Sequence, residues 1–342
     1  MCFFGKKFVG LDIADTSIEV ALVGKPWGQT KVLSVGRLEL ENGIVKNGKI
    51  VDKEKLGLAI KQVMNEAAPR PIKSKDICFG LSEGQTFLHN IYINAVDRKE
   101  KQRIIDEEIA ENIPLNKGDL AYSFRVLNES KEKTELLIVA TRQTVLNEWK
   151  DFFKSINLDV VSFDIEILAT FRNLFDNLSK EPVMLLDIGA NTTYVAIFDE
   201  FGLRYEYIVN IAGNDFSETF ADVLGLTFQE AEVEKIKSGL RSSNSKVLEI
   251  LQGQLDKILF SIDTSILNFK DKTNKEVKKV FLVGGSSLLI GLPEYFSKSL
   301  GISAEVGNSR LTKEELPLVY IEAIGLAMRK IEKRWDKTDP NF

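Results

Sequence analysis

The sequence contains very little cysteine and histidine: its 342 residues include two cysteines, Cys2 and Cys78, and one histidine, His89. Two cysteines do not make a disulfide framework, so we expect the chain to work in a reduced, cytosolic environment. A single histidine excludes histidine-based metal clusters, and a serine triad could rest only on His89. That residue lies in an alternating stretch, 86–92, which predicts a surface position on a strand.

Long apolar runs and a dominant charge are also missing. No stretch approaches the roughly 20 apolar residues that span a bilayer. The N-terminus does not resemble a signal peptide, because Lys6 and Lys7 follow its first apolar residues at once. The 45 basic and 50 acidic residues give a net charge of −5 without a long basic run. We therefore expect no nucleic-acid partner, and contact with a membrane only through another protein.

Two short segments, 9–20 and 185–195, share one pattern. Each is an apolar run that reaches an aspartate, Asp12 or Asp187, followed by a tight turn of small and hydroxyl residues and a second apolar run. Each pattern predicts a β-hairpin. Backbone amides that point into such turns bind phosphate oxygens, and short polar side chains add donors. The candidate binding residues in the turns are Thr16, Ser17, Gly189, Asn191, Thr192 and Thr193.

The two aspartates predict a magnesium site. A carboxylate a few residues before a phosphate-binding turn lies just beyond direct phosphate contact, where it can hold the waters of a hydrated Mg²⁺. Asp12 and Asp187 are therefore the candidate metal ligands. Two such hairpins suit a metal–polyphosphate gripped from both sides, so the first hypothesis is a two-lobed nucleotide clamp.

Strands and helices alternate along the rest of the chain, and 342 residues predict two to four subdomains. The expected elements before residue 82 are a strand at 32–40, a helix at 53–67 with Asp52 as its N-cap, and a strand at 77–81. After residue 183 we expect helices over most of 216–270, a strand at 280–283 that runs into Gly284 and Gly285, and a final helix at 319–334.

Residues 83–159 predict an inserted α+β unit. The expected order is strand, helix, strand, strand, helix, with the helices at 98–112 and 143–156. Isoleucines give the first of these helices one apolar face, with charges elsewhere. A unit of this size has only a small core. The alternative, that this stretch is a continuous part of the first lobe, stays open.

The order of hairpin, connecting helix, hairpin and strand–Gly-Gly resembles the actin, sugar-kinase and heat-shock-70 superfold. Within it, the chain most resembles the PilM family of type IV pilus assembly and its relative FtsA. The resemblance rests on the first hairpin, on 108–115 with 122–127, on 164–166 and on the second hairpin. It implies an α/β, actin-like (ribonuclease H-like) two-lobed ATPase fold with an inserted small α+β subdomain.

The resemblance also implies a division into four parts. The first-lobe core takes 1–82, 160–182 and 319–342, and the inserted subdomain takes 83–159. The second-lobe core takes 183–215 and 271–318, and 216–270 form its helical subdomain.

ATP with Mg²⁺ is the implied cofactor, and the resemblance gives roles to single residues. Asp12 and Asp187 would face Mg²⁺, and Glu166 would orient the attacking water. A helix-surface position is the other interpretation of Glu166, and an ordinary i,i+3 ion pair that of Glu234 with Lys237. The residues implied around ribose, phosphate and adenine are Gly213, Asn214, Glu234, Lys237, Gly284, Gly285 and Ser286.

The first turn departs from the family pattern at two positions. Ala14 stands where the family usually has glycine, and Asp15 adds a negative charge beside the expected phosphates. If the turn needs a positive φ, alanine costs roughly 1 kcal/mol and its methyl group crowds the phosphate. Both changes predict slow or absent hydrolysis more than a loss of binding.

The function implied is an ATP-binding scaffold on the cytoplasmic face of the inner membrane. It would hold the N-terminal cytoplasmic tail of a PilN-like membrane protein in a groove between the first lobe and the inserted subdomain. Contacts with other platform or motor proteins, and self-association, stay open. The alternatives are an FtsA-like cell-division anchor, a small-molecule kinase of the same superfold, and an interaction protein that has lost its nucleotide. The tail at 329–340 is short and mixed in charge, unlike the basic membrane helix of FtsA.

Overall fold

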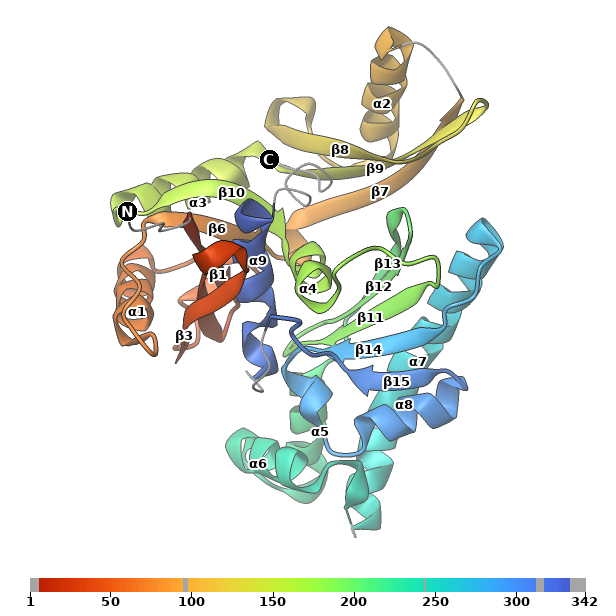
Figure 1. Ribbon diagram of the computed structural model, residues 1–342. Helices are drawn as coiled ribbons and strands as arrows, with labels where there is room; N and C mark the ends of the chain where they lie inside the picture. Colours follow the sequence, from red (N-terminus) through yellow and green to blue (C-terminus); the bar gives the residue numbers. More distant parts are fainter. Residues whose placement is uncertain (1–5, 95–97, 243, 312–316, 333–342) are drawn as a thin grey trace. The chain divides into compact units, whose positions relative to one another are not determined.

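The computed structural model describes residues 6–94, 98–242, 244–311 and 317–332. The chain divides into two compact units, one of residues 1–177 with 309–342 and one of residues 178–308. Each unit contains a five-stranded sheet flanked by helices (Figure 1). Among the described helices, none is long and apolar enough to cross a bilayer. The finer division into four parts stays a prediction.

The sheet of the first unit has the strand order β10-β6-β1-β2-β3. The chain runs as an antiparallel meander through β1, β2 and β3, and β6 and β10 then add in parallel beside β1. The pairing sets Asp12 directly opposite Glu19. The strands are β1 (Lys7–Ile13), β2 (Ser17–Gly24), β3 (Lys31–Glu39), β6 (Asp76–Leu81) and β10 (Asp159–Ile165), with a short hairpin of β4 (Val45–Lys46) and β5 (Lys49–Ile50).

The second unit repeats this topology. Its sheet has the order β15-β14-β11-β12-β13, with the meander and the two added parallel strands in the same places. The hairpins predicted from 9–20 and 185–195 are confirmed as the first two strands of each sheet. The strands are β11 (Val183–Ile188), β12 (Thr193–Asp199), β13 (Gly202–Val209), β14 (Lys279–Val283) and β15 (Ser303–Val306).

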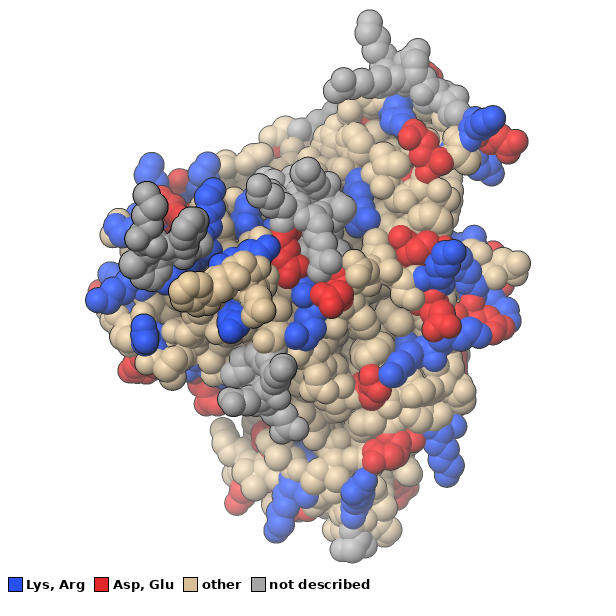
Figure 2. Space-filling view, in the orientation of Figure 1, with Lys and Arg blue, Asp and Glu red and all other residues tan. Residues whose placement is uncertain are grey.

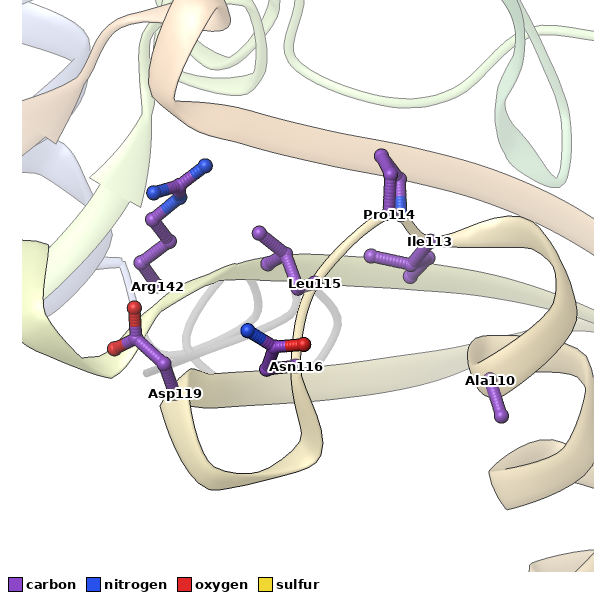
Figure 3. A pocket seen from close by; sticks show the side chains of 7 residues that line it. All are labelled: Ala110, Ile113, Pro114, Leu115, Asn116, Asp119 and Arg142. Carbon is purple, nitrogen blue, oxygen red and sulfur yellow. The ribbon is translucent and has the colours of Figure 1, made fainter.

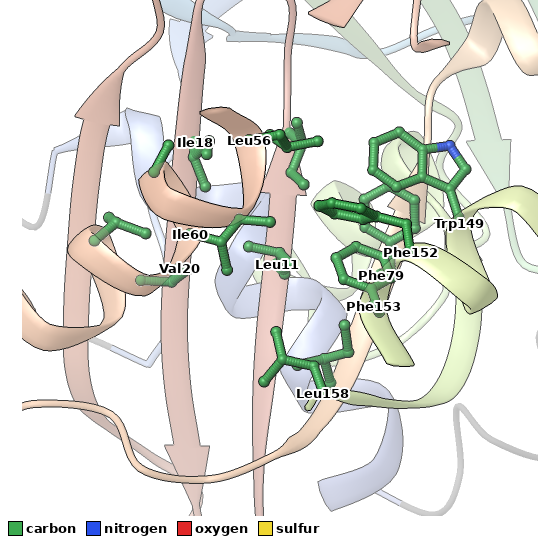
Figure 4. Packing of buried hydrophobic residues seen from close by; sticks show 14 of the residues in the cluster. Leu11, Ile18, Val20, Leu56, Ile60, Phe79, Trp149, Phe152, Phe153 and Leu158 are labelled. Carbon is green, nitrogen blue, oxygen red and sulfur yellow. The ribbon is translucent and has the colours of Figure 1, made fainter. Parts of the chain in front are cut away.

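One face of the first sheet packs on α1 (Lys53–Glu66) and α3 (Gln143–Ser155), as Figure 4 shows. The side chain of Asp52 caps α1 as predicted, by accepting a hydrogen bond from the Lys55 amide. Phe79 from β6 lies under the aromatic side chains of α3, with ring centroids 4.5 Å from Trp149 and 5.0 Å from Phe153. Aromatic contacts of this kind add to the burial of apolar surface.

The other face of the first sheet is covered by α4 (Glu166–Leu174) and α9 (Ile321–Ile331). Small residues allow backbone contact here. A Cβ on Gly10 would lie 1.7 Å from the Ala323 carbonyl oxygen, and a Cβ on Gly325 would lie 1.9 Å from the Ala169 carbonyl oxygen. The expected start at residue 319 is early by two positions, because 318–320 form a 3₁₀ turn, and the expected end at 333–334 lies outside the described residues.

The inserted part has a sheet of its own, in the order β7-β9-β8. Helix α2 (Arg98–Asn112) covers one face through Ile105 and Ile109 and keeps the predicted bounds. The predicted second helix of this part does not join it. Helix α3 packs into the core of the first five-stranded sheet, because its aromatic face matches Phe79. The strands are β7 (Thr86–Asn94), β8 (Leu120–Glu129) and β9 (Lys133–Arg142).

Helices dominate the second unit between β13 and β14, as predicted. Helix α7 buries Leu251, Leu255, Ile258 and Ile262 against the sheet at helical spacing. A 3₁₀ turn, Gly239–Arg241, follows α6. The helices of this unit are α5 (Gly213–Leu224), α6 (Phe228–Ser238), α7 (Ser245–Thr273) and α8 (Leu292–Leu300).

Candidate functional site

The turn between β1 and β2 holds the predicted residues of the first hairpin. The Ala14 amide donates to the Ser17 carbonyl oxygen over 3.0 Å, and the Leu40 amide donates to the Thr16 carbonyl oxygen over 2.8 Å. Ala14 and Thr16 are exposed. The described non-glycine residues with positive φ do not include Ala14. The backbone cost expected for alanine at this turn therefore does not arise.

Asp15 is bound away from the turn. Its carboxylate accepts hydrogen bonds from the backbone amides of Asn47 (2.9 Å) and Gly48 (3.3 Å) in the β4–β5 hairpin. The Gly48 carbonyl oxygen in turn accepts from the Gln85 side chain over 2.7 Å. The negative charge that sequence reasoning placed beside the phosphates is therefore stabilised by a neighbouring turn.

Two buried carboxylates lie opposite each other beside the first turn. Asp12 and Glu19 are paired across β1 and β2, and both are almost fully buried. Glu19 accepts from the Ser17 hydroxyl over 3.2 Å and from the Arg37 guanidinium over 2.8 Å. Burial and the charge of Asp12 nevertheless raise the pKa of Glu19 to about 8. The sequence analysis missed Glu19, although the apolar strand around it was a signal for a buried charge.

The second hairpin builds a compact cluster with the start of α5. The Gly189 amide donates to the Thr192 carbonyl oxygen over 3.0 Å. The Gly189 and Ala190 carbonyl oxygens then accept from the amides of Gly213 (3.1 Å) and Asn214 (2.8 Å). The turn is thereby joined to the N-terminus of a 12-residue helix, the end that carries the positive pole of the helix dipole. Such an end favours a phosphate group.

Side chains of the second hairpin divide into exposed and internal groups. Asn191 and Thr192 are exposed, and the Asn191 side-chain oxygen accepts from the Asn214 amide group over 2.8 Å. The Thr193 hydroxyl is buried and donates to the Ile211 carbonyl oxygen over 2.7 Å. Thr193 therefore holds the turn in shape, while Asn191 and Thr192 are accessible to a ligand.

Two of the predicted glycines, Gly213 and Gly284, lie where a side chain has no room. Gly284 has a φ of 79°, and a Cβ there would lie 2.2 Å from Oδ1 of Asp187. A Cβ on Gly213 would lie 2.4 Å from Oγ of Ser286, whose hydroxyl donates to the Gly189 carbonyl oxygen over 3.1 Å. The structure thus brings together the second hairpin, the start of α5 and the end of β14. Gly285 begins the 3₁₀ turn beside them.

The lysine of this cluster is Lys235, not the predicted Lys237. Lys235 is 5% exposed, and its ammonium group donates to the Gly213 carbonyl oxygen (2.9 Å) and to Glu232 (2.7 Å). Glu232 also accepts from the Ser217 hydroxyl. Lys237 is exposed, and Glu234 accepts from Ser238. The Glu-x-x-Lys spacing fits both pairs, so the sequence alone could not choose between them.

Glu166 begins α4 in the first unit and is 9% exposed. Two residues earlier, Asp164 is fully buried between Arg172 (2.8 Å) and Arg329 (2.5 Å), which come from α4 and α9. Burial alone would raise the pKa of Asp164, but the two guanidinium groups hold it below its usual value. The motif at 164–166 therefore has a packing role through Asp164, and the role of Glu166 stays a prediction.

A metal here would depend on few protein ligands. Within the described ranges, no group of three or more His, Cys, Asp or Glu side chains could enclose an ion. Hydrated Mg²⁺ needs no such group, because it keeps several waters and takes one or two carboxylates together with phosphate oxygens. Asp187, beside the Gly284 turn, fits that limited demand.

A pocket of about 330 Å³ lies in the inserted part, where α2 ends and β8 begins. Figure 3 shows Ile113, Pro114 and Leu115 between Arg142 at one end and Ala110 at the other. Asp119 at the rim accepts from the amide and hydroxyl of Thr144, which fixes the start of α3. Most of the accessible lining of the pocket is polar, and Arg142 is its cationic side chain.

The repeated sheet order, each beginning with an aspartate hairpin, defines an actin-like α/β fold. A crystal structure of MreB 5 of Spiroplasma citri bound to AMPPNP is similar to the chain, with a TM-score of 0.58, 12% identity and 97% of each chain covered. A structure described as the PilM-PilN type IV pilus biogenesis complex gives a TM-score of 0.81 at 20% identity, over 95% of this chain and 98% of that one.

Sequence comparison gives the family. A family profile described as "Type IV pilus assembly protein PilM" matches residues 10–331, and the chain belongs to this family. Cell division protein FtsA of Pseudomonas aeruginosa is 24% identical over 386 aligned positions, covering 97% of this chain and 91% of the relative. The resemblance stated from the motifs is thereby confirmed.

Proposed function

We propose that the chain is an ATP-binding scaffold of a type IV pilus assembly platform, where it holds the N-terminal cytoplasmic tail of a PilN-like membrane protein. Family membership and the similarity to the PilM-PilN complex support the partner. The FtsA-like alternative has weaker support, because the curated FtsA relative is only 24% identical while the matching family profile is PilM. The proposed location is the cytoplasm, peripheral to the inner membrane.

One observation carries the nucleotide part of the proposal. Ser286 donates to the Gly189 carbonyl oxygen and leaves no room for a side chain at Gly213, at the start of a helix and beside the buried Lys235. Turn amides, a helix N-terminus and a cation are the groups that bind polyphosphate. Asn191 and Thr192 would add polar contacts, and Asp187 would hold waters of Mg²⁺.

The first hairpin contributes a second set of groups in this proposal. Asp12 would take part in Mg²⁺ binding, with Thr16 and Ser17 beside the phosphates. Glu19, opposite Asp12, adds a second carboxyl, which its raised pKa of about 8 keeps mostly protonated at neutral pH. We propose that ATP is bound and hydrolysed slowly or not at all, with Glu166 as the candidate residue for any hydrolysis.

Replacing each of the two lysines by methionine tests the nucleotide site. We expect Lys235→Met to weaken Mg·ATP binding at least ~10-fold and Lys237→Met to change it less than ~2-fold, because only Lys235 contacts Gly213. Titration calorimetry measures both, and thermal unfolding confirms that each variant is folded. A larger effect of Lys237→Met than of Lys235→Met would contradict this assignment. It would support the pair predicted from the sequence, Glu234 and Lys237.

The pocket in the inserted part is the candidate contact for the partner tail. Its mostly polar lining and Arg142 suit a short peptide that presents acidic or carbonyl groups. We expect Leu115→Arg to weaken binding of a synthetic PilN-like N-terminal peptide at least ~10-fold. Val126→Arg on β8 is the matched control, since Val126 is exposed and does not line the pocket. Equal loss in both variants would contradict this assignment.

A further inference from the structure

The loop between β2 and β3 holds an unusual tryptophan. Trp27 lies in the 3₁₀ turn Pro26–Gly28, and its side chain is 93% exposed, the highest value among the described large apolar residues. Its φ is 55° and that of Gly28 is 80°. A bulky side chain seldom adopts this left-handed conformation, and among the described residues no packing of the ring offsets its cost. Backbone strain that fold packing does not explain points to a role outside the fold.

Lysines surround this loop, because strand ends meet at one edge of the first sheet. Lys7 at the start of β1 pairs with Gly24, and Gly24 pairs with Lys31 at the start of β3. The start of β6 lies at the same edge, where the Lys75 carbonyl oxygen accepts from the Asp159 amide. The exposed cationic residues of this edge are Lys6, Lys7, Lys25, Lys31, Lys73, Lys75 and Lys154, against the acidic Asp76 and Asp159.

Four of these lysines keep their charge available to a partner. Within the described part of the chain, the side chains of Lys25, Lys31, Lys73 and Lys75 form no ion pair. In the space-filling view, Lys and Arg predominate over Asp and Glu on the left-hand part of the first unit, where β1 begins and α3 ends (Figure 2). The chain as a whole carries −5, so this edge is a local reversal of its sign.

We propose that this basic edge, defined by Trp27 with Lys25, Lys31, Lys73 and Lys75, docks on an anionic lipid bilayer. Tryptophan prefers the interface between hydrocarbon and water, where its ring is half buried and its N–H stays hydrated. Lysines beside such an anchor are attracted to the negative headgroups over about one Debye length. One aromatic residue at a loop tip with lysines around it matches a flat charged surface.

A nucleic acid fits these residues less well. Single strands are bound in grooves by several aromatic side chains on which successive bases stack, and this edge offers a single tryptophan on a protruding loop. Lysine also gives point charges, whereas phosphate recognition at fixed geometry favours the bidentate fork of arginine. The proposal goes beyond the proposed function: it adds a direct membrane contact to the one that a PilN-like partner would provide.

Vesicle flotation tests the proposal. The full chain is mixed with vesicles of phosphatidylcholine alone or with 30 mol % phosphatidylglycerol (about one charge in three lipids), at low and high salt. We expect binding only to the anionic vesicles, weakened by salt. Trp27→Ala and Lys25→Glu/Lys31→Glu should each reduce it at least ~10-fold, without shifting the unfolding temperature.

Matched controls distinguish docking through this edge from effects of net charge and of exposed apolar side chains in general. Lys257→Glu/Lys298→Glu changes the net charge equally at exposed sites of the second unit, and Phe260→Ala removes a side chain that is 76% exposed on α7. Both should bind like the wild type. The proposal is overturned if wild type does not bind anionic vesicles, or if the controls lose as much binding as the edge variants. Binding to single-stranded DNA but not to vesicles would also overturn it.

Discussion

At the scale of residues, the second unit depends on contacts that allow no side chain. A Cβ on Gly284 would lie 2.2 Å from the Asp187 carboxylate, and a Cβ on Gly213 would lie 2.4 Å from the Ser286 hydroxyl. The sequence marks both glycines as turn signals, in strand–Gly-Gly and in Gly-Asn after a strand, and their role at a nucleotide stays a prediction. It did not predict Lys235, because the burial of one lysine among four charged neighbours on α6 is decided by long-range contacts with Gly213.

Glu19 makes stability depend on pH. Its pKa is raised from 4.5 to about 8, so the folded protein keeps a proton on Glu19 that the unfolded chain has lost. The free energy of unfolding should therefore fall as the pH rises from about 4.5 to about 8. We expect Glu19→Gln to flatten this fall and to be more stable than the wild type above pH 8, by ~1–3 kcal/mol.

Urea unfolding between pH 5 and pH 9 measures this difference. Glu39→Gln, at an exposed carboxylate on β3, is the control and should keep the wild-type slope. If Glu19→Gln and the wild type lose stability in parallel across this range, Glu19 is not the titrating group.

Asp15 should have little effect on nucleotide affinity. Its carboxylate is occupied by the amides of Asn47 and Gly48, so it does not oppose the phosphates. Asp15→Ala should cost ~0.5–1.5 kcal/mol of stability through the two lost hydrogen bonds. Calorimetry should show an Mg·ATP dissociation constant within about 2-fold of the wild type, and a clear gain in affinity would show that the charge does reach the site.

At the scale of elements, most helices and strands follow from local pattern. Helix 98–112 was predicted at its observed bounds, because charges enclose an apolar isoleucine face and Pro114 ends it. The partner of an element is harder to predict. Helix α3 follows the inserted strands in sequence, yet Trp149 and Phe153 pack on Phe79 of the main sheet. The apolar periodicity and the helix propensity of a sequence predict the apolar face of a helix. They do not predict which sheet that face will cover.

Helix α9 should be intolerant of even one methyl group at its contacts. Because a Cβ on Gly325 would lie 1.9 Å from a backbone oxygen of α4, relief requires the two helices to separate. We expect Gly325→Ala to destabilise the first unit by ~3 kcal/mol or more, as overpacking against backbone does. Gly253→Ala on α7 is the matched control: nothing lies near its Cβ, so it should stabilise by up to ~1 kcal/mol.

Thermal and urea unfolding of the two alanine variants decide this point. Loss of stability only in Gly325→Ala fits the close packing of α9. Equal stability of Gly325→Ala and the wild type would mean that α9 does not approach α4 as closely as described.

At the scale of the whole molecule, the chain carries one sheet topology twice. The sequence of the two hairpins predicted this repeat, because in each an aspartate is followed by a turn of small residues. That the last helix packs on the first sheet was expected only from the resemblance, which assigned 319–342 to the first-lobe core, since no local pattern says where a terminal helix docks. The exposure of Trp27 could not be predicted either. The sequence shows a Pro-Trp-Gly turn, but it does not show that the tryptophan ring is 93% exposed.

The most direct test of the central claim is titration calorimetry of ATP with and without Mg²⁺, on the wild type and on Asp187→Asn. Asp222→Asn, at an exposed carboxylate on α5, is the control. We predict Mg²⁺-dependent binding that Asp187→Asn weakens at least ~10-fold and Asp222→Asn leaves unchanged, with little phosphate released from the same samples. No binding of ATP by the folded wild type, or binding indifferent to Mg²⁺ and to Asp187, would contradict the account.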